Sequence, residues 1–284
     1  MPKLNLNRRK TREAMKPKYF AIPYVGWMAL FVVAPIILVF VFAFTTPTGE
    51  LTLRNFSDMY LFMPVFLRSF RLAFAATAIC IVLGYPVAYI LARETQSVQR
   101  VLFMLIMLPL WMNFLLRTYA WMSILENTGL LNQLLTFLHL PAIRIINTEA
   151  AVVIGMVYNF MPFMILPIYS VIVKIDKNLL EAAQDLGANS FSVFRKLIIP
   201  LSIPGILSGV TMVFVPAVSA FVITQLLGGG MVFLLGDLIE MQFLGTAHNP
   251  HVGSAISIVM MLIVIAFVIL MNKFGSGEEK NIRL

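Results

Sequence analysis

Long stretches without a single Asp, Glu, Lys or Arg limit what this chain can fold into. These uncharged runs are 19–44, 72–92, 101–116, 150–173, 197–236 and 241–272. A transmembrane helix needs about 20 consecutive, mostly apolar residues. In the whole chain 60% of the residues are hydrophobic and only 12% are charged, whereas about a quarter are charged in a typical soluble protein. The sequence therefore predicts an all-α integral membrane protein.

Six transmembrane helices follow from these runs and their interruptions. Gly228–Gly230 ends a helix inside the fifth run, and His248–His251 interrupts the sixth. The expected spans are about 20–44, 67–92, 101–125, 150–173, 198–226 and 252–272. They form one domain, 19–273, between two tails, 1–18 and 274–284. The polar excursions are too short to bury a core of their own, and the sequence has no Gly-x-x-x-x-Gly-Lys-Ser/Thr phosphate loop.

The basic residues are distributed unevenly between the two sides of these spans. All but five of the 21 Lys and Arg residues lie in 1–18, 93–100, 174–196 and 273–284, which share one side of the membrane. The other five are Arg54, Arg68, Arg71, Arg117 and Arg144. An excess of Lys and Arg marks the cytoplasmic side, so we expect both termini in the cytoplasm. The same rule explains the net charge of +8 without nucleic acid.

The sequence gives little support to metal, disulfide or catalytic chemistry. Cys80 is the only cysteine, so no intrachain disulfide can form. It lies in a span, where a small buried apolar residue is the default interpretation. His248 and His251 are separated by Asn-Pro and have no evident third ligand. We therefore expect no metal, no bound cofactor and no enzymatic activity in this chain.

One polar stretch between the fourth and fifth spans, 174–200, is patterned as a helix–turn–helix. Asn178 and Glu181 have the spacing of a capping box at a helix start. An apolar stripe follows on one face of that helix: Leu179, Ala182, Ala183 and Leu186. Gly187 suits a helix C-cap because it tolerates positive φ, and Ser190 can cap a second helix. The small, smooth face favours docking into a groove of a partner protein.

The same stretch resembles the signature loop of bacterial binding-protein-dependent ABC importer permeases. The family pattern is Glu-Ala-Ala, three residues, Gly, nine residues, an apolar residue, one more, an apolar residue and Pro. The matching positions here are Glu181, Ala182, Ala183, Gly187, Leu197, Ile199 and Pro200. The late apolar positions are usually Ile and Leu, so Leu197 and Ile199 are conservative departures. The loop also has the family's location, between the fourth and fifth of six spans.

Three further stretches are similar to the permeases of spermidine/putrescine importers: Gly84–Ala92, Leu108–Trp121 and Met161–Tyr169. The resemblance spans roughly 20–272 and implies a type I ABC importer permease of the MetI-like fold in the bacterial cell membrane. Related permeases carry other small solutes, so an amino acid, thiamine, iron or an oxyanion is the alternative cargo. A secondary transporter would show inverted repeats and a coupling-ion site, and neither is evident in the sequence.

The resemblance also implies the partners of the chain. This subunit and a second homologous permease would line one pathway through the lipid, and an external binding protein would deliver the polyamine. A dimer of separate ATPase subunits would use ATP and Mg²⁺. The loop would seat on the ATPase as a coupling helix, through Leu179, Glu181, Ala182, Ala183, Leu186, Gly187 and Pro200. Capping its own helix explains Glu181 equally well.

Aromatic and amide side chains inside the spans are candidates for the substrate pathway. A polyamine is a chain of ammonium groups, which aromatic faces and oxygen atoms can bind. Polar groups at membrane depth usually face the interior of a helix bundle. The candidates are Tyr85, Trp111, Asn113, Tyr158 and Asn159. Hydrogen bonds between packed helices are the alternative for Trp111 and the two asparagines, and an interfacial aromatic belt is favoured for Trp121.

Three charged residues bear on the outer end of such a pathway. Asp237 and Glu240 are three residues apart and share one face if this segment is helical. Two carboxylates there could attract a polycation, although a solvated face or a contact with the binding protein is the favoured alternative. Arg117 would repel a polycation, so we expect it to pair with a carboxylate or to lie near the outer surface.

Overall fold

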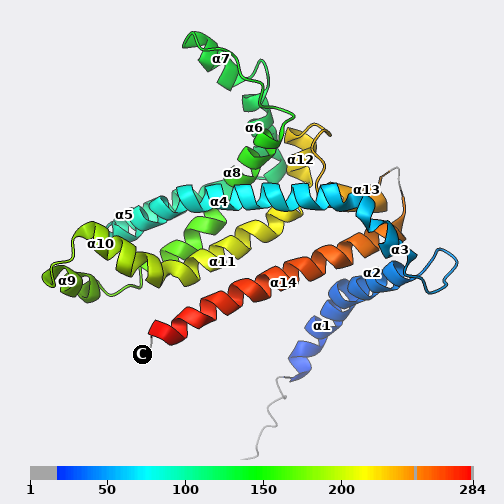
Figure 1. Cartoon of the computed structure of the whole chain (residues 1–284), viewed down its shortest axis with the longest axis horizontal. Coiled ribbons are helices and arrows are strands. Elements are labelled where there is room, and N and C mark those ends of the chain that lie inside the picture. Colours follow the sequence, from blue (N-terminus) through cyan, green and yellow to red (C-terminus); the bar gives the residue numbers. More distant parts are fainter. Residues whose placement is uncertain (1–17, 246–247, 283–284) are drawn as a thin grey trace, which may run out of the picture.

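The computed structural model describes residues 18–245 and 248–282, and the secondary structure of this part is helical apart from one isolated bridge between Thr45 and Leu51. The predicted N-terminal tail lies outside the described residues except for Lys18. The helices are α1 (Lys18–Met28), α2 (Ala34–Phe44), α3 (Arg54–Ser57), α4 (Met63–Arg93), α5 (Gln96–Trp111), α6 (Phe114–Leu125), α7 (Leu130–Phe137), α8 (Glu149–Ile172), α9 (Lys177–Asp185), α10 (Ser190–Val193), α11 (Ile199–Val218), α12 (Val222–Leu227), α13 (Leu235–Phe243) and α14 (Pro250–Ile282). Figure 1 places α9 and α10 at one end of the molecule and α3 and α13 at the other.

The described helices give five candidate membrane spans, or six if one bent pair of helices is counted as a broken span. Five helical segments are long and apolar enough to cross a membrane: Pro23–Phe44, Arg54–Arg93, Glu149–Ile172, Ser190–Val218 and Pro250–Phe274. The sixth crossing is the pair Gln96–Trp111 and Phe114–Phe137, counted as one span, whose halves are bent by 92°. In Figure 1, α6 and α7 accordingly project away from the long axis of the bundle.

Three predicted helix bounds are wrong. The continuous helix expected over 101–125 is interrupted at Met112 and Asn113, because Asn113 caps a new helix. The fifth span is expected to reach 226, but α11 ends at Val218 and the chain turns before α12. Hydropathy cannot mark that end, since the uncharged run continues past it. The last helix is longer than expected, because α14 continues to Ile282.

Two wide helical turns precede prolines within the spans. The π turns Ala29–Val33 and Phe194–Ile198 lead directly into α2 and α11, each of which has a proline, Pro35 or Pro200, in its first two residues. A proline has no N–H, and its ring clashes with the carbonyl four residues earlier. The wider π turn gives that carbonyl room. The chain therefore passes both prolines without stopping, and α10, its π turn and α11 form one continuous rod.

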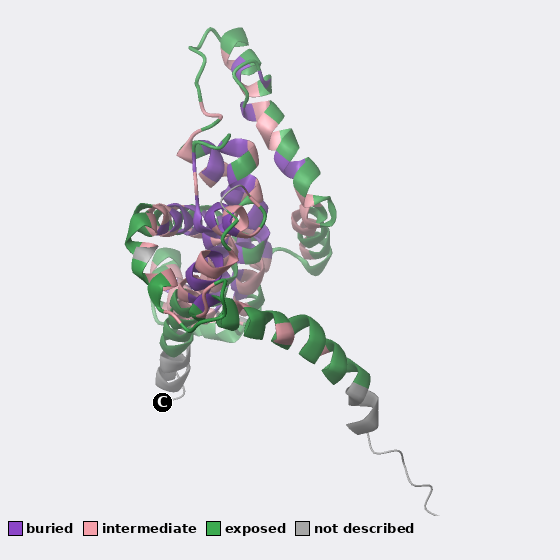
Figure 2. Cartoon of the chain, turned by 90° about the vertical axis from the view of Figure 1, so that its right-hand side faces the viewer, coloured by how far each residue is buried: buried purple, intermediate pink, exposed green. Residues whose placement is uncertain are grey.

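The centre of the molecule is formed by α4, α8 and α11, which pack against one another and hold most of the buried side chains (Figure 2). The long helix α14 lies against α11 and α13 and pairs with α2. The first span differs from the others, because Ala43 is the only buried residue in the described part of 23–44. Most of its other apolar side chains are exposed in the single chain, although α2 packs against α14.

Two glycines let α11 approach α8 closely. Gly205 and Gly209 are four residues apart on the α11 face that meets α8. A Cβ atom at Gly205 would lie 2.8 Å from the carbonyl oxygen of Pro167, and one at Gly209 would lie 2.7 Å from Sδ of Met164. Small residues at this spacing are used where membrane helices pack tightly, since lipid supplies no hydrophobic force between helices.

We predict that Gly209→Leu destabilises the folded chain by about 1–3 kcal/mol, because an overpacked contact forces α8 and α11 apart. Ser208→Leu is the matched control, since Ser208 is exposed at the adjacent position of the same helix. Thermal unfolding in detergent should give a lower midpoint for Gly209→Leu than for Ser208→Leu. Equal midpoints for the two variants would contradict the role given to this glycine.

Candidate functional site

The polar stretch 174–200 folds as the expected helix–turn–helix, but other residues cap its helices. The N-cap of α9 is Asp176, whose Oδ1 accepts a hydrogen bond from the Asn178 N–H at 2.9 Å. The N-cap of α10 is Asn189, whose Oδ1 accepts from the Ser192 N–H at 2.8 Å. The predicted caps at Asn178 and Ser190 are therefore wrong. In both places a suitable residue lies one or two positions earlier, and the helix starts there.

The end of α9 confirms the role predicted for Gly187. Its φ is +87°, in the left-handed region that favours glycine. Its N–H donates to the carbonyl of Gln184 at 2.8 Å, and the Ala188 N–H donates to the carbonyl of Ala183 at 3.1 Å. These bonds close the helix end and reverse the chain towards α10.

Most of the predicted docking face of α9 is uncovered. Leu186 is 89% exposed and Leu179 is 46% exposed, while Glu181 and Ala182 are also exposed. Leu180, Ala183 and Ala188 instead pack against the central core. The helix is thus anchored on one side and free on the other, at the end of the molecule shown on the left of Figure 1.

The break between α5 and α6 is held by two polar side chains. Asn113 Oδ1 accepts hydrogen bonds from the N–H groups of Leu115 at 2.9 Å and Leu116 at 3.3 Å, and so caps the start of α6. Arg117 reaches back from α6, and its Nη1 donates to the Pro109 carbonyl near the end of α5. Trp111, the last residue of α5, is 82% exposed.

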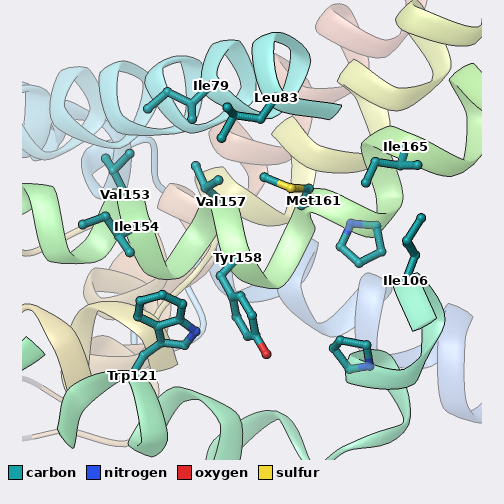
Figure 3. A pocket seen from close by; sticks show the side chains of 12 residues that line it. Ile79, Leu83, Ile106, Trp121, Val153, Ile154, Val157, Tyr158, Met161 and Ile165 are labelled. Carbon is teal, nitrogen blue, oxygen red and sulfur yellow. The ribbon is translucent and has the colours of Figure 1, made fainter. Parts of the chain in front are cut away.

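An apolar cavity of about 470 Å³ lies among α4, α5, α6 and α8 (Figure 3). Its wall is almost entirely hydrocarbon, from side chains that include Ile79, Leu83, Ile106, Pro109, Val157, Met161 and Ile165. Tyr158 of α8 and Trp121 of α6 are its aromatic residues, with ring centroids 5.1 Å apart. Tyr158 therefore lies beside the broken span.

Two other candidates make hydrogen bonds inside the packed bundle. The hydroxyl of Tyr85 lies 2.9 Å from that of Ser202 and joins α4 to α11. Asn159 is buried, and its amide donates to the Gly155 carbonyl at 2.8 Å, while its Oδ1 has no partner among the described residues. The structure thus separates Tyr85 and Asn159 from the exposed pair Trp111 and Asn113.

Asp237 and Glu240 are on the same short helix, α13, but in different environments. Asp237 is buried, and Oδ2 accepts from the Leu234 N–H at 2.9 Å, while the Thr224 hydroxyl lies 2.7 and 2.8 Å from its two oxygens. Burial raises the pKa of Asp237 to about 6. Glu240 accepts from Gln225 Nε2 at 2.9 Å and lines a groove of about 280 Å³ with Asp237.

Sequence reasoning missed a charged cluster at the start of α8. Glu149 accepts a hydrogen bond from Arg71 Nη2 at 2.6 Å and lies 3.4 Å from Arg68 Nε. These contacts join α4 to the first residue of α8. The spacing of Arg68 and Arg71 indicates one helix face, but the sequence does not say which carboxylate meets it.

The raised pKa of Asp237 predicts a pH effect on stability. Between pH 3.8 and about pH 6, the folded chain binds more protons at the Asp237 carboxyl than the unfolded chain does. The contribution of Asp237 to stability therefore falls as pH rises through this window. We expect Asp237→Asn to remove that contribution, because an amide still accepts from the Leu234 N–H without carrying charge. Thermal midpoints of wild type and variant should diverge in favour of the variant from pH 4 to pH 7, and parallel curves would contradict the assignment.

Comparison with known sequences places these features in a family. Residues 81–275 match the family described as binding-protein-dependent transport system inner membrane component. The spermidine/putrescine transport system permease protein PotB of Haemophilus influenzae is 40% identical over 243 residues, which are 82% of this chain and 85% of that protein. PotB of Escherichia coli is 39% identical over 253 residues, 86% of this chain and 92% of that protein. The E. coli inner membrane ABC transporter permease protein YdcU is 32% identical over 250 residues, 81% of this chain and 78% of that protein.

Solved structures share the fold at low sequence identity. A chain of a bacterial ABC transporter that imports the acidic polysaccharide alginate superposes with a TM-score of 0.73 at 16% identity, covering 91% of this chain and 94% of that chain. A chain of the MetNI methionine ABC transporter, in an inward-facing conformation, superposes with a TM-score of 0.59 at 17% identity, covering 78% of this chain and 98% of that chain. The expected fold of an ABC importer permease is thereby confirmed.

Proposed function

The chain belongs to the family of binding-protein-dependent transport system inner membrane components, and we propose that it is a permease subunit of an ATP-driven polyamine importer. It forms one membrane pathway with a second homologous permease. An external binding protein delivers spermidine or putrescine, and a dimer of ATPase subunits on the cytoplasmic side uses ATP and Mg²⁺. The excess of Lys and Arg near the inner ends of the spans supports a cytoplasmic location for both termini.

One observation carries the choice of substrate. The chain is about 40% identical over more than four-fifths of its length to two permeases of spermidine/putrescine transport systems. The region that matches the family, 81–275, also spans the broken third crossing. A transport component of this kind moves a solute and performs no covalent chemistry on it.

The break between α5 and α6 supports a pathway at this place. Non-helical backbone is tolerated at membrane depth only where protein or a water-filled cavity surrounds it, and transporters place broken helices at their substrate sites. Trp111 and Asn113 are exposed beside the break in the single chain. We assign them, with Tyr158, to a pathway wall shared with the second permease. Their rings and amide would contact ammonium groups, and Glu240 would attract them at the outer end.

The helix–turn–helix supports a coupling role at the opposite end. The exposed face of α9, with Leu179, Glu181, Ala182 and Leu186, would dock on an ATPase subunit. Because α10 and α11 are one rod through the π turn, a displacement of α9 would be transmitted to the centre of the bundle. Pro200 lies at the junction and fixes the shape of that rod.

We predict that Gly187→Pro uncouples ATP hydrolysis from transport, because proline can neither adopt positive φ nor donate the N–H that ends α9. Gly49→Pro is a closely matched control. Gly49 has φ of +85° and its N–H also donates to a carbonyl three residues earlier, but it lies in the loop after α2. In the reconstituted complex, Gly187→Pro should retain ATPase activity while its uptake falls by about tenfold or more. Gly49→Pro should keep the wild-type ratio of uptake to ATP hydrolysis. A wild-type ratio in Gly187→Pro would contradict the role given to α9.

Uptake measurements test the substrate directly. The chain is produced with the neighbouring ATPase, second permease and binding protein, and vesicles are supplied with labelled spermidine or putrescine. We expect ATP-dependent accumulation that is lost when this subunit is omitted. If polyamine accumulation does not exceed that control while an amino acid, thiamine, iron or an oxyanion is taken up, the polyamine assignment is wrong and that solute is the substrate.

A further inference from the structure

Arg117 is a buried cation at the bend of the third span. Only 6% of the residue is exposed. Its Nη1 donates to the Pro109 carbonyl, and its guanidinium carbon lies 5.8 Å from the ring centroid of Phe114 and 5.9 Å from that of Tyr158. Its Nε is buried and has no hydrogen-bond partner among the described residues. The chain's own atoms enclose Nε, whereas Nη2 is not enclosed and makes no hydrogen bond within the described residues, so a group from outside would approach the guanidinium at Nη2.

The surroundings of Arg117 offset only part of its charge. The Pro109 carbonyl is near the C-terminus of α5, where the helix dipole favours a cation, and the two rings add weak cation–π attraction. The ion pairs formed within residues 18–245 and 248–282 do not include Arg117. A buried charge that lacks its counter-ion strongly destabilises a protein, and charges inside membrane segments are usually paired. A carboxylate at Nη2 would supply the counter-ion through a charge-assisted hydrogen bond.

The depth of Arg117 restricts where that carboxylate comes from. Tyr158, which it contacts, lies about 14 Å along α8 from Glu149, and α8 is about 36 Å long. For a hydrocarbon core of about 30 Å, Tyr158 is roughly 10 Å inside the outer boundary. Lipid headgroups and the ATPase are therefore out of reach of a guanidinium that is already bound to Pro109. A polyamine carries the same sign of charge and cannot be the partner.

We propose that Arg117 forms an ion pair with a carboxylate of the second permease subunit, at the break in the third span. This inference rests on the proposed function, because it needs a second permease beside this chain. The neighbouring residues Trp111, Leu116 and Tyr119 are exposed in the single chain, and so are free to lie in the same contact. The pair would hold the bent span against the partner and neutralise the cation beside the polyamine pathway.

A charge-reversal experiment tests the pair in the complete complex. Arg117→Glu should lower recovery of the second permease on tagged chain by about tenfold or more. In that background each Asp and Glu within the spans of the second permease is changed to Lys in turn. One of these changes should restore recovery and uptake. Arg117→Met, which keeps the bulk without charge, should weaken assembly, and Arg117→Lys should restore part of it.

Controls separate this inference from misfolding and from the proposed function. Arg54 is an exposed residue of α3. Arg54→Glu therefore reverses a surface charge and should leave assembly unchanged. Wild-type assembly is measured without substrate, so a failure of polyamine uptake does not affect the result. Normal recovery of the second permease with Arg117→Met would overturn the proposal. A second result would also overturn it. In this result Arg117→Glu is produced at the wild-type level with an unchanged thermal midpoint, yet no Asp or Glu to Lys change in the second permease restores assembly.

Discussion

Every backbone group freed by a break in a membrane helix needs a partner, and this requirement governs the structure. An unsatisfied N–H or C=O in lipid costs on the order of several kcal/mol. At Pro35 and Pro200 the chain meets the requirement with π turns, which keep the span continuous. In the third crossing Asn113 satisfies N–H groups of α6 and Arg117 a carbonyl of α5. Side chains, and not hydropathy, therefore decide where this membrane domain bends.

Helix packing connects the two ends of the molecule. At the centre α11 packs closely on α8 at Gly205 and Gly209, and the helix from α10 through α11 continues to the helix–turn–helix. Other parts are less covered, because the arm of α6 and α7 projects from the bundle in Figure 1, and most side chains in the described part of the first span are exposed although α2 pairs with α14. The single chain is thus complete at its core and open where a partner subunit is proposed.

Much of the site could be predicted from sequence, but its contacts could not. The positive φ of Gly187 followed from the position of a glycine after an apolar stripe. The sequence predicts caps at Asn178 and Ser190, but several Asx and Ser residues fit the rule, and the folded chain uses Asp176 and Asn189. The sequence predicts that Arg117 pairs with a carboxylate or lies near the outer surface; within the described chain it donates instead to the Pro109 carbonyl, a partner set by the 92° bend.

The sequence by itself determined the class of protein, the apolar segments long enough to cross a membrane and the location of the polar loop, because hydropathy and charge act locally along the chain. It also placed the chain among importer permeases through a spaced motif, 181–200. Only the tertiary structure decided that Asp237 is buried on Thr224 and Leu234 while Glu240 faces a groove, and that Tyr158 borders the broken span. Burial and hydrogen bonding depend on which helices meet, and that information is not carried by the spacing of residues in one segment.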